Sequence, residues 1–270
     1  MDFITLVIIG LCMGLLGGML GIGGSIVMIP AMTLVFGENQ HLYQAAAMIC
    51  NFFVSASALI AHRKADTFVK GTLIWLIPAA IIGILGGVML SNCSFFAGGK
   101  SYLLARMFGI FLIYVIVYNS YRLYLNLHPK IEIVQKPMPG KNTASLFSGL
   151  CGVITGLAAG LLGIGAGTVA TPLQQVTLKL PLRKAMSNSA VTIVCISWLG
   201  AIYKNWTLPQ HGLHFSDSFK IAVLVIPGSI IGGFIGGHLM HALPKNLVRA
   251  AFILVCILAA VKLLTVILAG

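Results

Sequence analysis

The chain has 270 residues, of which 59% are hydrophobic and 8% are charged, and its mean hydropathy is +1.01. Ordinary soluble domains carry about 25% charged residues, so the composition excludes such a domain and indicates an all-α polytopic membrane protein. The net charge of +12 comes from Lys and Arg scattered among loops, which suits the anionic inner face of a membrane. These Lys and Arg side chains do not form the compact basic cluster that would indicate a nucleic-acid partner.

The first half of the chain, residues 1–126, begins with an apolar run that contains a glycine cluster. This run covers residues 3–36 and is interrupted at Gly21, Gly23 and Gly24. Each glycine lowers helix propensity by about 1 kcal/mol relative to alanine, so we expect the helix to break there. Three segments follow, each long enough to cross the roughly 30 Å hydrocarbon layer, and a polar linker then leads to the second half. The segments are 44–62, 71–91 and 102–126, and the linker is 127–142.

The second half, residues 143–270, repeats this plan. Its first run, 143–178, is interrupted at Gly163, Gly165 and Gly167. Gly21 aligns with Gly163, and a proline follows each cluster at the same distance. Internal duplication of this kind is common in transporters. The later segments are predicted at 184–204, 218–241 and 246–268.

Charge distribution favours a re-entrant hairpin in each half over a single crossing. If each broken run crosses the membrane once, Lys and Arg divide almost evenly between the two faces. If each run turns back at its glycines, twelve of these cations share the face of the 127–142 linker, as the positive-inside rule requires. Each half is then a hairpin plus three transmembrane helices, the halves are inverted repeats, and both termini lie outside.

The glycine breaks are the candidate substrate site. A short helix resumes near Ser25 and near Thr168, and its first N–H groups and positive dipole end suit an anion. Asn51 and Asn188 lie near the start of the next segment in each half and can donate hydrogen bonds to the same ligand. Glycines are also typical of close helix packing in membranes, which is the better interpretation of those at 83–87 and 232–237.

The sequence contains no pattern typical of an enzyme, a cofactor site or a metal site. All five acidic residues fall in predicted loops or at segment ends, so a carboxylate-based proton relay within the membrane is disfavoured. The expected partners are therefore lipid and a small anionic substrate. A membrane accessory subunit remains as an alternative, and the oligomeric state stays open.

The paired Gly21-Ile22-Gly23-Gly24 and Gly163-Ile164-Gly165-Ala166-Gly167 motifs, each followed by a proline, resemble the TauE/SafE sulfite exporter family over essentially the whole chain. The resemblance implies a multi-pass permease of the bacterial inner membrane that moves sulfite or an organosulfonate, without a cofactor. A channel-like anion facilitator is the alternative. Ala166 stands where the first motif has Gly24, so the two breaks are not identical.

Overall fold

The structure, a computed structural model, describes residues 3–37, 39–64, 68–93, 102–128 and 140–268. These residues form an all-helical protein, as the composition predicts, and seven helices are long and apolar enough to cross a membrane. The helices are α1 (Phe3–Leu20), α2 (Ser25–Phe36), α3 (Gln40–Lys64), α4 (Lys70–Ser91), α5 (Tyr102–Leu127), α6 (Lys141–Leu162), α7 (Gly167–Thr177), α8 (Leu182–Thr207), the 3-10 helix η2 (Leu208–His211), α9 (Phe215–Ala242) and α10 (Lys245–Leu268).

Both glycine clusters interrupt the helices at the predicted places. The first cluster separates α1 from α2, and the second separates α6 from α7. Gly21, Gly23 and Gly163 have φ angles of 61°, 74° and 68°, a left-handed conformation that residues with a Cβ rarely adopt. The breaks therefore follow directly from the amino acids at these positions.

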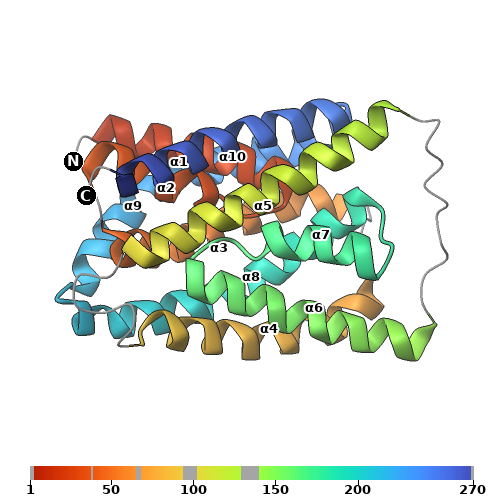
Figure 1. Ribbon diagram of the computed structural model, residues 1–270, viewed down its shortest axis with the longest axis horizontal. Coiled ribbons are helices and arrows are strands. Elements are labelled where there is room, and N and C mark those ends of the chain that lie inside the picture. Colours follow the sequence, from red (N-terminus) through yellow and green to blue (C-terminus); the bar gives the residue numbers. More distant parts are fainter. Residues whose placement is uncertain (1–2, 38, 65–67, 94–101, 129–139, 269–270) are drawn as a thin grey trace.

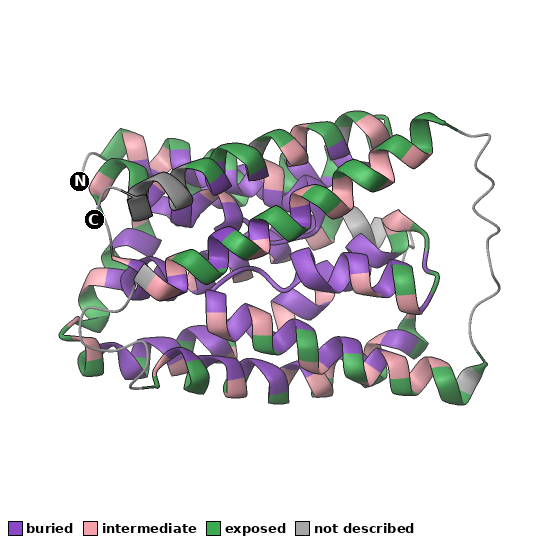
Figure 2. Cartoon of the chain, viewed as in Figure 1, coloured by how far each residue is buried: buried purple, intermediate pink, exposed green. Residues whose placement is uncertain are grey.

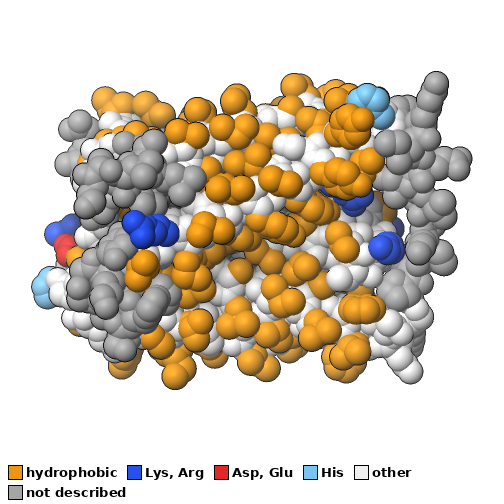
Figure 3. Space-filling view, in the orientation of Figure 1, with side chains coloured by type: hydrophobic (Ala, Val, Ile, Leu, Met, Phe, Trp, Pro, Cys, Tyr) orange, Lys and Arg blue, Asp and Glu red, His pale blue; other side chains and the backbone are white. Residues whose placement is uncertain are grey.

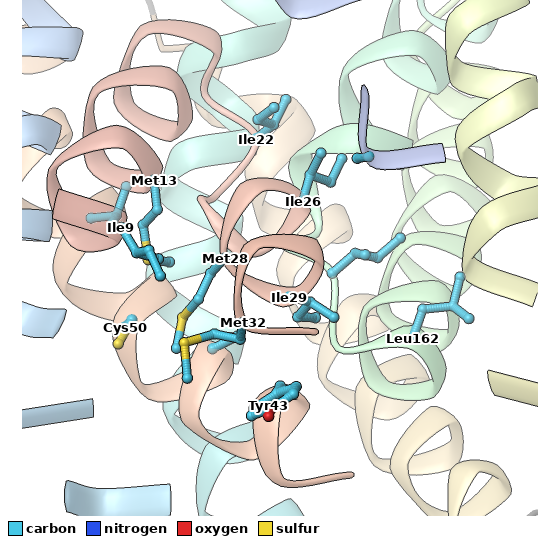
Figure 4. Packing of buried hydrophobic residues seen from close by; sticks show 14 of the residues in the cluster. Ile9, Met13, Ile22, Ile26, Met28, Ile29, Met32, Tyr43, Cys50 and Leu162 are labelled. Carbon is cyan, nitrogen blue, oxygen red and sulfur yellow. The ribbon is translucent and has the colours of Figure 1, made fainter. Parts of the chain in front are cut away.

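Each short helix packs against the helix that precedes it, α2 against α1 and α7 against α6. A Cβ on Gly24 would lie 2.6 Å from the Met13 carbonyl oxygen, so the chain after the first break runs close beside α1. The interior around α2 is filled by methionine and aliphatic side chains (Figure 4), among them Met28 and Met32, which are fully buried. The first broken run thus forms a compact helix pair.

Glycines also allow two pairs of long helices to pack closely, α1 along α9 and α6 along α4. A Cβ on Gly14 would lie 2.8 Å from the Gly233 nitrogen, and one on Gly87 would lie 3.0 Å from the Gly160 Cα. Figure 1 shows α4 and α6 side by side along one edge and α5 beside α10 along the other. The packing role expected for the glycines near 83–87 and 232–237 is therefore confirmed at Gly87 and Gly233.

The outer surface has the character of a protein that lies in lipid. Burial is concentrated between the helices, whereas the outer face of α5 is exposed (Figure 2). Hydrophobic side chains cover the middle of the visible face, and the described charged side chains and histidines lie toward its two ends (Figure 3). This distribution fits a multi-pass membrane protein.

Helix α3 begins at Gln40, earlier than the predicted residue 44. The Asn39 side chain accepts a hydrogen bond from the Leu42 N–H, and the Asn39 carbonyl accepts one from Tyr43. Asn39 therefore starts the helix as an N-cap, and this start signal extends the helix through polar residues. The added turn contains His41, which is buried.

Candidate functional site

The two glycine breaks touch each other inside the molecule. A Cβ on Gly23 would lie 2.9 Å from the Gly165 Cα, so there is no room for a side chain between them. A Cβ on Gly167 would overlap the carbonyl oxygen of Gly21, and one on Gly165 would overlap that of Ile22. The glycines in each break thus permit direct contact between backbone segments from opposite halves of the chain.

Ser25 and Asn51 hold the two breaks together. The Asn51 Oδ1 atom accepts hydrogen bonds from the Gly24 and Ser25 N–H groups at 2.9 and 3.2 Å. The Asn51 Nδ2 group donates to the Ser25 Oγ at 2.8 Å, and the Gly165 N–H donates to the same oxygen at 2.7 Å. Since Ser25 and Asn51 are almost fully buried, this network lies inside the protein and stabilises the contact between the two breaks.

Asn51 therefore uses two of the backbone donors that the sequence assigns to an anion. Its carbonyl oxygen stands at the start of α2, where the helix dipole favours a negative partner. The structure places Gly21, Gly23, Gly24, Ser25, Asn51, Gly165 and Gly167 together at this contact.

The second half arranges its polar residues differently. The Thr168 hydroxyl donates to the Gly165 carbonyl at 3.1 Å. Asn188 does not hold the second break: its Oδ1 accepts from the Val69 N–H at 2.9 Å, and its Nδ2 donates to Gln174 at 3.2 Å. Because Val69 precedes the first residue of α4, Asn188 supports the start of that helix. The two asparagines are thus not structurally equivalent.

A pocket opens beside the start of α7, with an empty volume of about 420 Å³ that includes space open to solvent. It reaches the first break at Ile22 and the second at Gly167 and Thr168. No lining residue carries a carboxylate. The lining comprises Leu20, Ile22, Tyr118, Asn119, Gly167, Thr168, Thr171, Pro172, Gln175, Leu182, Met186, Arg249 and Phe252.

Two arginines give this pocket a positive charge. Arg249 lines the pocket and is 6% exposed. The Arg122 Nη2 group donates to the Oε1 of Gln175, another lining residue, at 3.0 Å. The buried Nε of Arg122 has no hydrogen-bond partner among the described residues. The start of α7 adds a positive dipole end, so the pocket is suited to an anion.

Arg122 and Arg249 are two of the twelve cations that the sequence places on the face of the 127–142 linker. Both nevertheless lie inside segments predicted to span the membrane, 102–126 and 246–268. An ionisable residue in such a segment is a functional candidate, because burial of a charge in lipid is unfavourable. That signal could have identified them, although their convergence on α7 depends on the folded structure.

Comparison with known proteins gives one family for nearly the whole chain. The model described as Sulfite exporter TauE/SafE matches residues 6–263. The probable membrane transporter protein MamO of Paramagnetospirillum magneticum is 26% identical over 300 residues, which cover 98% of this chain and 45% of the relative. The chain thus spans about half the length of that relative.

Other relatives match along most of their own length. The probable membrane transporter protein YunE of Bacillus subtilis is 23% identical over 98% of both chains. The probable membrane transporter protein MJ0441 of Methanocaldococcus jannaschii is 26% identical over 84% of this chain and 79% of the relative. No solved structure matches this chain significantly.

Proposed function

Because the chain belongs to the sulfite exporter TauE/SafE family of membrane transporters, we propose that its substrate is a small sulfur-containing oxyanion, sulfite or an organosulfonate. The observation that carries this proposal is the pocket beside α7, which is lined both by the buried Arg249 and by Ile22 and Gly167 of the two glycine breaks. Substrate would enter here and pass through the breaks when they separate.

Electrostatics favour an anion over a cation or a neutral solute. A buried cation is strongly destabilised unless an opposite charge accompanies it. The pocket lining has Arg249 and no acid, and Arg122 is near enough to repel Arg249. A bound anion would relieve this repulsion and supply the missing countercharge.

The donor types favour an oxyanion. A guanidinium presents paired N–H groups that match two oxygens of one anion. The hydroxyls of Thr168 and Thr171 line the same pocket, and the Thr171 hydroxyl already shares a hydrogen bond of 3.0 Å with Ser189. The Thr168 hydroxyl likewise donates to the Gly165 carbonyl, so the Arg249 guanidinium is the charged donor that suits an acceptor with several oxygens, such as sulfite.

The contact between the breaks favours a carrier over a channel. The pocket reaches Ile22 and Gly167, and there the backbones of the two halves touch. Substrate could cross only if the breaks move apart, which fits alternating access. In the alternative, a channel-like facilitator, substrate on the far side would not accelerate uptake, so a counterflow assay separates the two.

We also propose that the halves are inverted repeats, each a re-entrant helix pair plus three transmembrane helices. Helices α1 and α6 are counterparts in the two halves, and so are α4 and α9. Each packs along a helix of the other half, α1 along α9 and α6 along α4, so the packing partners are exchanged between the halves. This exchange is expected of two similar units related by a pseudo-twofold axis. The 127–142 linker would then face the cytoplasm.

Cysteine labelling tests this topology. Gly140 and Gly212 both have open space around the Cβ position. In a variant without native cysteines, Gly140→Cys should be tolerated, whereas Gly212→Cys should lower stability by about 1–2 kcal/mol because Gly212 has a φ of 71°. We expect an impermeant maleimide to label position 140 only from the cytoplasmic side and position 212 only from the opposite side. Labelling of both from one side would contradict the inverted arrangement.

Sulfite flux into proteoliposomes tests the anion site. Arg249→Gln should reduce flux by about tenfold or more, since a hydrogen bond to a charged group contributes roughly 1.5–3 kcal/mol. Arg106→Gln is the matched control, because Arg106 is exposed on α5 and does not line the pocket. Equal flux in the wild type and Arg249→Gln would remove the pocket from the transport path.

A further inference from the structure

A second buried cation lies at the opposite end of α8 from the pocket. Leu182 at the start of α8 lines the pocket, whereas Lys204 lies near the end of this 26-residue helix, which is about 39 Å long. The Lys204 side chain has no solvent exposure. A buried basic side chain thus lies toward each end of α8.

Among the described residues, the hydrogen bonds of the Lys204 ammonium are to neutral groups. The Nζ atom donates to the Ser91 Oγ at 2.8 Å and to the Asn92 Oδ1 at 3.2 Å, and it lies 3.0 Å from the His41 Nδ1. The His211 ring stacks on the His41 ring at a centroid distance of 3.7 Å. These contacts hold the ammonium in place but supply no countercharge.

Acidic residues are scarce in the part of the chain that the structure describes. Asp217, in the first turn of α9, is the one acid there. It forms none of the hydrogen bonds given above for Lys204. A fully buried ammonium without a carboxylate is strongly destabilised, and a mobile anion would relieve this.

Unpartnered amides lie between Lys204 and the breaks. Gln44 is fully buried, and neither its Oε1 nor its Nε2 has a hydrogen-bond partner among the described residues. A Cβ on Gly163 would lie 2.7 Å from the Gln44 Cβ, so this side chain lies against the second break. The Nε2 of Gln40, one turn earlier on α3, is also buried without a described partner.

Such unpartnered groups call for an explanation, because buried amides are nearly always hydrogen-bonded. Two amide N–H₂ groups on one helix face, with His41 and its partner Lys204 beside them, form a set of donors with a positive charge. That combination matches the requirements of an oxyanion stripped of water.

We propose that Lys204, Gln40 and Gln44 form a second oxyanion-binding site, on the opposite side of the breaks from the Arg249 pocket. This inference rests on the proposed function. The anion passes from one buried cation to the other when the breaks separate, and each cation receives it from its own face of the membrane. A divalent metal is a poor occupant, because the Lys204 ammonium would repel it.

The test measures sulfite flux in oriented proteoliposomes, with the substrate supplied at one face at a time. Lys204→Met should raise KM about tenfold or more at the face where α8 ends, because a buried charge contact is lost. KM at the face of the Arg249 pocket should stay near the wild-type value. Gln44→Met, which keeps the charge, should raise KM at the same face by a smaller factor and serves if Lys204→Met fails to fold.

Three results would overturn the proposal. A wild-type KM at both faces in Lys204→Met and Gln44→Met, with Arg249→Gln still impaired, would overturn this site alone. A lower maximal rate with KM unchanged at both faces would show that Lys204 only supports the fold. If the wild type carries none of sulfite, thiosulfate, sulfoacetate, taurine, carboxylates or chloride, the proposed function fails, and this inference fails with it.

Discussion

The backbone N–H of Gly165 donates a hydrogen bond of 2.7 Å to the hydroxyl oxygen of Ser25, across 140 positions of the sequence. The same oxygen accepts a hydrogen bond of 2.8 Å from Asn51. One side-chain atom thus joins both glycine breaks and α3, which carries Asn51. Separation of the breaks during transport would require this bond to open.

Ser25→Ala should lower stability, because it leaves the Gly165 N–H and the Asn51 amide without an acceptor. Each unpaired buried group costs roughly 1–3 kcal/mol. We expect a lower Tm of the purified protein in detergent. Ser148→Ala is the matched control, since the buried Ser148 hydroxyl donates only within α6, to Ala144. An equal Tm for the two variants would contradict the bridging role of Ser25.

Asn51→Leu and Asn188→Leu should have different effects. Asn51 holds the first break, so its loss frees the Gly24 and Ser25 N–H groups and should change KM for sulfite as well as Tm. Asn188 supports the start of α4, so its loss should lower the free energy of unfolding by about 1–3 kcal/mol, which is seen as a lower Tm. The KM for sulfite should stay near the wild-type value. An altered KM in Asn188→Leu would show that this amide contacts the substrate after all.

Gly23→Leu should abolish most sulfite flux in proteoliposomes. The side chain would have to adopt a φ of 74° and would collide with Gly165. Gly37→Leu separates these two effects, because Gly37 has a φ of 86° but nothing within 4 Å of its Cβ position. We expect Gly37→Leu to retain flux, with a loss of stability of about 1–3 kcal/mol, because a φ of 86° with a ψ of −173° is a backbone conformation that is essentially restricted to glycine. Comparable flux in both variants would exclude the contact between the breaks from the mechanism.

Gly156→Ala and Gly149→Ala, both on α6, test the packing of that helix along α4. A Cβ on Gly156 would lie 2.7 Å from the Ile84 nitrogen, so the alanine should lower stability by about 1–3 kcal/mol. Gly149 has open space at its Cβ position, so alanine there should raise stability by up to about 1 kcal/mol. Thermal unfolding in detergent gives the comparison, and a stabilised Gly156→Ala variant would contradict the close α4–α6 contact.

The amino-acid sequence alone predicted the helices and their interruptions. Apolar runs of about 20 residues specify spanning helices through local composition. The three glycines at 21–24 and the three at 163–167 specify the breaks, because glycine weakens a helix wherever it stands. The start of α3 was missed because Gln40 and His41 are polar, and their burial depends on partners such as Lys204.

The functional site could be predicted only in part. The glycine breaks and the hydroxyl of Ser25 were identified from the motif, and they do lie together. The motif did not indicate that Asn188 serves α4, or that Arg122 and Arg249 flank α7. Repeat symmetry suggested equal roles for Asn51 and Asn188, whereas each side chain takes its partner from whichever helix packs beside it.

The sequence by itself determined an all-helical membrane protein with two glycine breaks, because hydrophobicity and glycine content act within a few residues of the chain. Only the tertiary structure decided that Gly165 meets Ser25, that Arg249 lines a pocket at the breaks, and that Lys204 is buried beside His41. These contacts join residues that lie far apart in the chain. They depend on which helix faces pack together, and no local pattern specifies that.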